Sequence, residues 1–254
     1  MKAFSSSLFL PLGLFLFITV QAAERPDAGT CTDTDWLSEE EAASAEEMVC
    51  RLHFLLRGGN VTDMTAFVRR LSARPDKKSI LNSWGDYGQT VLHRLTNRNL
   101  CRLLITQGAD VDARDVSEAT PLHQNALYAV KSLCRILLAY GAKVDATDKD
   151  GRTPLHCAAR RGDKQALPVV ELLVAAGADI HAKSKDGLTP LHMAAWSGNH
   201  AVVVFLLYKG ALVDAKSNDG KTPWDLARER GHATSKMKDV LAHVRAYDCG
   251  QAGE

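Results

Sequence analysis

The sequence predicts an all-α repeat solenoid, in which helix-turn-helix units with β-turn fingers stack along one axis. Two observations predict this fold: a six-residue motif recurs five times, and each copy is followed by the same succession of segments. A single unit of this kind cannot bury its apolar face, whereas stacked units bury one continuous core. The fold class therefore follows from the repetition itself.

The repeated motif is Gly-x-Thr-Pro-Leu-His or a close variant of it. Its threonine falls at positions 90, 120, 153, 189 and 222, which gives steps of 30, 33, 36 and 33 between successive copies. Thr-Pro suits the start of a helix, because threonine can cap it and proline is tolerated in a first turn. In the fifth copy Trp224 and Asp225 replace Leu-His. That departure suits a terminal unit with a solvated outer face.

The rest of each unit predicts two short helices. Alanine pairs such as Ala158–Ala159 follow the motif, and their small side chains let a first helix pack closely on its neighbours. After a turn, leucines spaced at i, i+3 and i+4 predict a second helix with one apolar face. Glycines such as Gly141 and Gly210 end that stretch, where a left-handed cap is expected.

Two units depart from the regular length. In the first, the closing glycine Gly108 follows the motif leucine Leu92 three positions sooner than in the second and fourth units, so short helices are expected there. In the third, the closing glycine comes three positions later, and the extra residues lie within 163–167. Pro168 follows this enlarged turn and is predicted to be the first residue of the second helix.

The Thr-Pro-Leu-His element, the alanine pair, the turn and the Gly-Ala ending, on a period near 33, resemble ankyrin repeats. The resemblance covers roughly residues 80–246, which corresponds to about five repeats. It implies a binding scaffold that works as a monomer before complex formation. The resemblance also implies that partners dock on the concave face, formed by the finger tips and the outer positions of the first helices.

The remaining segments are expected to be a signal peptide, a tail, a cap and a second tail. Residues 1–23 have a positive start, an apolar run and a small-residue ending, so cleavage is expected near Ala22–Ala23, with a periplasmic or secreted product. The apolar run from Leu8 to Val20 is too short to span a bilayer as a helix. Residues 24–36 and 247–254 are predicted to be flexible tails, and 37–79 a helical N-terminal cap or degenerate repeat. Its helices are expected from Ser38 to about Arg57 and from Met64 to Leu71.

Charge and motifs exclude several function classes. Cleavage would remove Lys2 and no acidic residue, so the mature chain would carry no net formal charge, and nothing calls for nucleic acid. No nucleophile elbow, phosphate loop, dinucleotide fingerprint or zinc spacing is present, so neither an enzyme nor a metal or cofactor site is predicted. The motif histidines occur once per unit, about 10 Å apart, which is too far to share a zinc ion. They are predicted to orient the turns by hydrogen bonding.

The six cysteines separate into two groups. Export permits disulfides, and Cys31 and Cys50, which flank one N-terminal segment, are the best candidate pair. Cys101 and Cys134 hold the same core position in adjacent units, about 8–10 Å apart, and are expected to be buried thiols. Cys157 is expected to be free, and Cys249 has no assigned partner.

The concave face defines the predicted partner-binding residues. It combines aromatic residues, which are frequent interface hot spots, with an excess of cations in its C-terminal half, so a partner with an acidic surface is expected. The predicted residues are Trp84, Tyr87, Arg114, Leu127, Tyr128, Arg152, Arg160, Arg161, Lys185, Leu188, Trp196 and Lys221. Val116, Lys149, Lys183 and Lys216 belong to the same surface.

Three functional hypotheses remain open at this point. The leading one is an exported scaffold that holds one partner protein in its groove, for example a periplasmic immunity or masking protein for a toxin or effector enzyme. The second is a periplasmic factor that stabilises an exported enzyme. The third is a secreted, host-directed effector, which glycosylation at the Asn60 sequon would favour.

Overall fold

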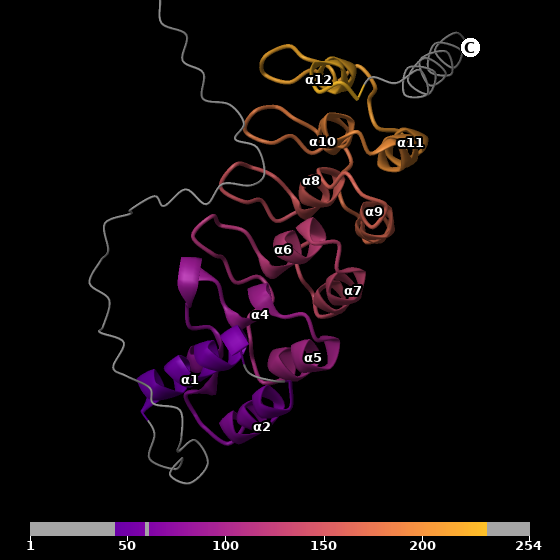
Figure 1. The fold of residues 1–254 in the computed structure, drawn as a ribbon. Helices are drawn as coiled ribbons and strands as arrows, with labels where there is room; N and C mark the ends of the chain where they lie inside the picture. Colours follow the sequence, from indigo (N-terminus) through magenta and orange to yellow (C-terminus); the bar gives the residue numbers. More distant parts are fainter. Residues whose placement is uncertain (1–43, 59–60, 233–254) are drawn as a thin grey trace, which may run out of the picture. The chain divides into compact units, whose positions relative to one another are not determined.

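The computed structural model describes residues 44–58 and 61–232, which belong to one compact unit. Across these two ranges the chain forms helices joined by loops and turns, without a strand (Figure 1). The prediction of an all-α repeat solenoid is confirmed. The expected signal peptide, both tails, Cys31, Asn60 and Cys249 lie outside the described residues.

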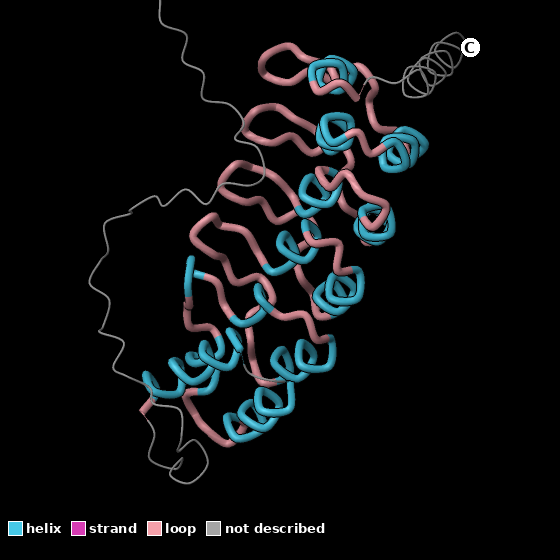
Figure 2. The backbone as a smooth tube through the Cα atoms, in the orientation of Figure 1, coloured by secondary structure: helices cyan, strands magenta, loops and turns pink. Residues whose placement is uncertain are grey.

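Two rows of helices run along the repeats, and finger loops project from one row (Figures 1 and 2). The first helices of the five units are α4 (Val91–Arg94), α6 (Pro121–Leu127), α8 (Pro154–Ala159), α10 (Pro190–Ser197) and α12 (Pro223–Glu229). The second helices are α5 (Arg98–Thr106), α7 (Lys131–Ala139), α9 (Ala166–Ala175) and α11 (His200–Tyr208). Each helix packs against its equivalent in the next unit, so the sequence period becomes a period in space.

Three further helices precede the five units: α1 (Ala45–Gly58), α2 (Val61–Leu71) and α3 (Lys77–Leu81). Helix α1 packs against α3 and α4, and α2 packs against α5, so this pair extends both rows. Leu52 of α1 and Leu71 of α2 are fully buried. Helix α2 begins three residues before the predicted start at Met64. The short helix α3 was not predicted, and it buries Ile80 and Leu81.

The irregular units differ partly from expectation. Helix α4 has only four residues, as the short first unit predicted, but α5 has nine, the same as α7. In the third unit the loop between α8 and α9 is enlarged as predicted, and Pro168 is the third residue of α9 rather than the first. Proline is tolerated there because the first N–H groups of a helix have no partner within the helix.

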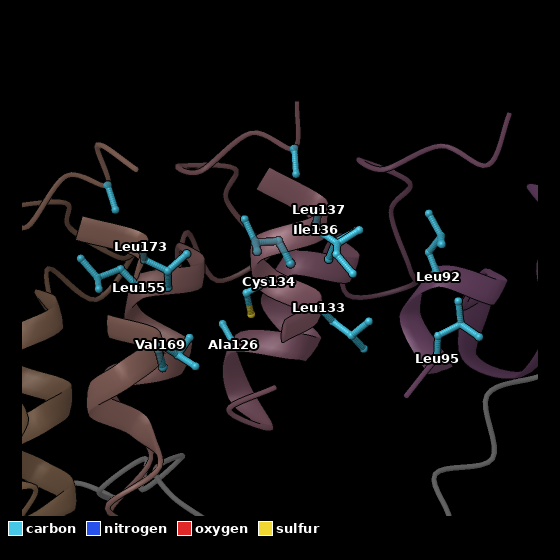
Figure 3. Packing of buried hydrophobic residues seen from close by; sticks show 14 of the residues in the cluster. Leu92, Leu95, Ala126, Leu133, Cys134, Ile136, Leu137, Leu155, Val169 and Leu173 are labelled. Carbon is cyan, nitrogen blue, oxygen red and sulfur yellow. The ribbon is translucent and has the colours of Figure 1, made fainter. Parts of the chain in front are cut away.

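The core is a stack of leucine and alanine layers that runs through the units (Figure 3). The motif leucines Leu92, Leu122, Leu155 and Leu191 are buried, and so are the alanine pairs that follow the third and fourth motifs. Cys101 and Cys134 are buried among them as free thiols, as predicted. Burial raises the pKa of Cys101 to about 11 and that of Cys134 to about 12, so both stay protonated at neutral pH.

Candidate functional site

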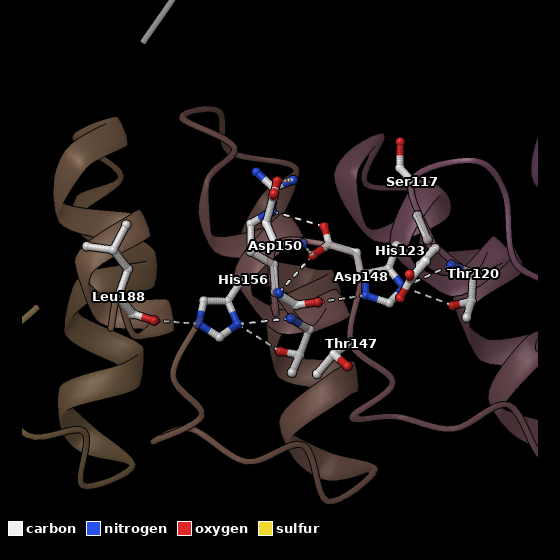
Figure 4. A network of polar contacts seen from close by, with 12 residues as sticks. Ser117, Thr120, His123, Thr147, Asp148, Asp150, His156 and Leu188 are labelled. Carbon is white, nitrogen blue, oxygen red and sulfur yellow. Dashed lines mark hydrogen bonds and ion pairs between the residues drawn. The ribbon is translucent and has the colours of Figure 1, made fainter. Parts of the chain in front are cut away.

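The finger loops and first helices are held in place by one repeated hydrogen-bond arrangement (Figure 4). In the third unit the Thr153 N–H donates to His156 Nδ1 at 3.1 Å, and His156 Nε2 donates to the Leu188 carbonyl at 2.9 Å. Leu188 belongs to the next finger. The histidine therefore caps its own helix and ties it to the following unit.

The same bridge occurs in every unit that has a following unit. The carbonyl acceptors are Ala119 for His93, Arg152 for His123, Leu188 for His156 and Lys221 for His192, at 2.9–3.1 Å. In the fifth unit Asp225 takes the place of the histidine and accepts the Thr222 N–H at 3.0 Å. The prediction that these histidines orient the turns is confirmed, and the structure adds their inter-repeat role.

Burial is the main cause of the lowered pKa of these histidines. It lowers the pKa of His156 to about 4, and it also lowers the pKa values of His93, His123 and His192. Each ring is therefore neutral at pH 7, with Nδ1 as acceptor and Nε2 as donor. The described residues contain no group of three His, Cys, Asp or Glu side chains arranged to hold a metal ion.

Neighbouring fingers are joined tip to tip by backbone hydrogen bonds. The N–H groups of Val116, Lys149, Lys185 and Asn218 donate to the carbonyls of Tyr87, Ser117, Asp150 and Asp186, at 2.9–3.2 Å. These bonds make the five fingers one continuous ledge beside the first helices. Side chains at equivalent finger positions therefore form rows along the ledge, which a partner would meet as one surface.

We expect Gly187→Ala to damage this ledge. Gly187 has φ +72°, and an added Cβ would lie 2.8 Å from the Asn218 backbone nitrogen, the donor that joins the last two fingers. The matched control is Gly177→Ala, at φ +91° with open space around it. Both should lose about 1–3 kcal/mol of stability to the left-handed backbone. Gly187→Ala should cost more in thermal unfolding and speed amide exchange at Asn218; equal costs would show that the finger contact contributes nothing.

The residue five positions before the motif threonine is charged in some fingers and neutral in others. In the second and third units it is Asp115 and Asp148, whose buried carboxylates accept backbone N–H groups of their own fingers. In the fourth and fifth units Ser184 and Ser217 take that position, and their hydroxyls accept the N–H of the residue four positions later at 3.2 Å. The later fingers thus keep the turn while losing a negative charge.

The predicted cations fall into two groups in the structure. Four are held by internal partners: Arg114 by the carbonyls of Glu118 and Thr147, Arg152 by Asp148 and Asp150, Arg161 by Asp163 and the Leu127 carbonyl, and Lys221 by Glu229. Arg160 and Lys185, together with Lys149, Lys183 and Lys216, form no ion pair with any residue in the described ranges and are exposed. The positive charges of this second group are therefore not neutralised by an ion pair within the described ranges and can meet a partner.

The predicted apolar residues also fall into an exposed group and a half-buried group. Trp84, Tyr87 and Tyr128 are 71%, 76% and 62% exposed. Leu127 and Leu188 are half-buried, and Leu188 packs against the core. Trp196 is half-buried, and the Arg230 guanidinium lies over its ring at 4.4 Å from the centroid. This contact of Arg230, which directly follows α12, was not predicted.

The first helices also carry a row of side chains at equivalent positions, beside the rows of the finger ledge. Counting seven residues from the motif threonines of the second, third and fourth units gives Leu127, Arg160 and Trp196, so three chemically different side chains hold one structural position. A cavity of about 150 Å³ opens between the second and third units, lined partly by Leu127, Arg152, Cys157 and Arg160. Cys157 is a free thiol there, and burial raises its pKa.

Cys50 is exposed on α1, and its pairing with Cys31 stays a prediction.

Comparison with protein families identifies ankyrin repeats (3 copies) in three overlapping segments, residues 42–148, 92–184 and 164–242. Together the segments cover most of the chain, including α1 and α2. No curated protein matches the sequence. No helix within the described ranges has the length and apolar character that a bilayer crossing requires.

Proposed function

Because the chain belongs to the ankyrin-repeat family, whose members are typically binding scaffolds without catalytic activity, we propose that it is an exported protein that holds one acidic partner protein on its finger ledge and first helices. The observation that carries this proposal is the set of exposed cations that form no ion pair within residues 44–58 and 61–232, namely Lys149, Arg160, Lys183, Lys185 and Lys216. Exposed charge of one sign favours encounter with a surface of the opposite sign.

Export is supported by the N-terminal pattern of one lysine, an apolar run and a small-residue ending. An exported chain that only binds would act by masking or by stabilising its partner, and the masking of a toxin or effector enzyme is the form that we propose. Fractionation of cells that express the full-length chain, with sequencing of the product's N-terminus, tests this step. A product retained in the cytoplasm with Met1 intact would refute export.

The partner-binding step is tested on a purified complex. The native partner would be captured by crosslinking to the exported chain, identified, purified and titrated against the wild-type chain. We expect the double variant Arg160→Ala/Trp196→Ala to lose at least about 2 kcal/mol of binding free energy, because both residues occupy the same row of first-helix positions. Salt should weaken the wild-type complex as well.

The matched control is Arg135→Ala/Lys164→Ala, which removes an exposed cation from α7 and another from the α8–α9 loop. It should bind within twofold of the wild-type chain. Melting curves of both variants separate lost contacts from lost folding, which matters because Trp196 stacks with Arg230. Unchanged affinity of the Arg160/Trp196 variant would remove this face as the site. Loss of partner activity in the complex would identify masking, whereas a raised partner melting temperature with activity kept would identify protection.

A further inference from the structure

The ledge changes its chemistry between the second and third fingers. On the N-terminal side, Trp84, Tyr87 and Val116 are strongly exposed, and Tyr128 at the end of α6 is also exposed. On the C-terminal side, the equivalent of Val116 is Lys149 in the third finger and Lys185 in the fourth. From the second to the fourth finger this row therefore passes from apolar to basic, with Asp86 and Asn218 at the equivalent positions of the first and fifth fingers.

The apolar half has no excess of positive charge, since its fingers carry Asp86, Asp115 and Glu118 against Arg114. Its cation Arg114 is bound to two carbonyls and lies 3.9 Å from the Glu118 carboxylate. The carboxylate of Asp115 is buried and accepts N–H groups of its own finger. Neither group leaves a strong free charge beside the exposed aromatic side chains.

The basic half keeps a positive charge because some of its acidic residues pair with an arginine of the same finger, and serine replaces others. Asp148 and Asp150 pair with Arg152, and Ser184 and Ser217 stand where the earlier fingers have aspartate. The described cations without an ion pair here are Lys149, Arg160, Lys183, Lys185 and Lys216. The finger-tip acids that remain among them are Asp186 and Asp219, so the half is positive overall.

Tyr87 supports the view that the apolar half is a contact surface. It has φ 59°, a left-handed conformation that is unfavourable for a residue with a side chain, and it is 76% exposed. An exposed aromatic ring held on strained backbone contributes little to folding, whereas aromatic rings are frequent anchors in interfaces.

We propose that the ledge binds one extended segment of the partner, about 12 residues long, in which an apolar block lies beside an acidic block. The apolar block covers Trp84, Tyr87, Val116 and Tyr128, and the acidic block meets the lysines of the third to fifth fingers. The length follows from four finger steps of about 10 Å each and about 3.3 Å per residue of extended chain. This inference rests on the proposed function and adds the chemistry and order of the bound segment.

The inference is tested with three fluorescein-labelled peptides of identical composition and of the same length as the proposed segment. One carries an apolar leucine-alanine block followed by five glutamates, the second has the two blocks in the opposite order, and the third is shuffled. Fluorescence anisotropy with the full-length chain should show one block peptide binding at least tenfold more tightly than the shuffled one. Raising the salt concentration should weaken that binding.

Variants separate the two halves of the ledge. Lys183→Glu/Lys185→Glu should lose at least tenfold in affinity for the block peptide and lose most of its salt dependence. Trp84→Ser/Tyr87→Ser should lose about fivefold or more and keep its salt dependence. The matched control is Arg102→Glu/Arg135→Glu, the same charge change on exposed positions of α5 and α7, which should stay within twofold. Melting curves verify that each variant folds.

Equal binding of block and shuffled peptides would overturn the inference and leave a general polyanion surface. An aromatic variant that binds like the wild-type chain would overturn it as well, and so would the absence of binding by any peptide. None of these results touches the titration with the native partner, so the proposed function would stand or fall separately.

Discussion

Leu155→Ala should lower the free energy of unfolding by about 3–5 kcal/mol. Leu155 is fully buried in α8, the middle first helix of the array, and α8 packs against α6, α9 and α10. Removing a buried isobutyl group loses its transfer free energy and leaves a cavity that stacked helices close only in part. In a repeat array each unit is supported by its neighbours, so damage in the middle weakens two interfaces at once.

Urea unfolding followed by circular dichroism measures this effect. Leu212→Ala is the matched control, because it makes the same chemical change at a position that is 61% exposed. The control should lie within about 0.5 kcal/mol of the wild-type chain. If the two variants unfolded at the same urea concentration, the leucine layer would not be the continuous core that the structure describes.

His156→Ala should cost about 2–4 kcal/mol at pH 7.5. It leaves the buried Thr153 N–H without its acceptor, which costs about 1–3 kcal/mol. It also removes the bond from His156 Nε2 to the Leu188 carbonyl, which still accepts the Ser184 N–H, at a further cost of about 0.5–1.5 kcal/mol. The control is His181→Ala, an exposed histidine in the finger segment of the fourth unit, for which little change is expected. Faster amide exchange at Thr153 alone, without global destabilisation, would mean that the bridge supports one turn only.

The cost of His156→Ala should also shrink as the pH falls. Above pH 6.5 the ring is neutral in both the folded and the unfolded chain, so its full contribution is present. Between pH 6.5 and about 4 the unfolded chain takes up a proton that the folded chain refuses, since burial lowers the pKa of the folded His156 to about 4. The free energy of unfolding therefore falls across this window, by up to about 1.4 kcal/mol per pH unit for this histidine.

Urea unfolding of the wild-type chain and the His156→Ala variant at pH 7.5, 6, 5 and 4.5 gives the comparison. The difference between the two proteins should decrease steadily toward pH 4.5. The wild-type chain should still be acid-sensitive beyond this one residue, because His93, His123 and His192 also have lowered pKa values. A difference that stayed constant with pH would show that His156 binds protons equally in both states.

The regular parts of the fold could be predicted because each rests on a local requirement. Thr153 before Pro154 marks a helix start, the buried Leu155 marks the core face, and Gly141 or Gly210 marks a left-handed ending, which the positive φ values confirm. Helix α3 was missed because five residues are too few to show a helical period. The position of Pro168 was misjudged because a first turn accepts proline at more than one position.

The sequence predicted where the candidate residues lie in the repeat, but not which of them have internal partners. The repeat register placed Arg114, Arg152, Arg161 and Lys221 on the predicted face, yet each of these side chains has an internal partner in the structure. Most of those partners lie two to eight positions away, as Asp148 and Asp150 do from Arg152, but the turn geometry decides which of them pair. The Leu127 carbonyl that accepts from Arg161 lies 34 positions away.

The sequence by itself determined the fold class, the period of the repeats, and the hydrogen-bonding role of the motif histidines in the turns, because these follow from spacing and from the chemistry of helix ends. Only the tertiary structure decided which charges remain available. Pairing such as that of Arg152 with Asp148 and Asp150, and stacking such as that of Arg230 on Trp196, depend on distances that the folded backbone sets. The predicted cations thus reduce to a smaller set that forms no ion pair in the part of the chain that the structure describes, and its positive charge lies beside an exposed aromatic surface.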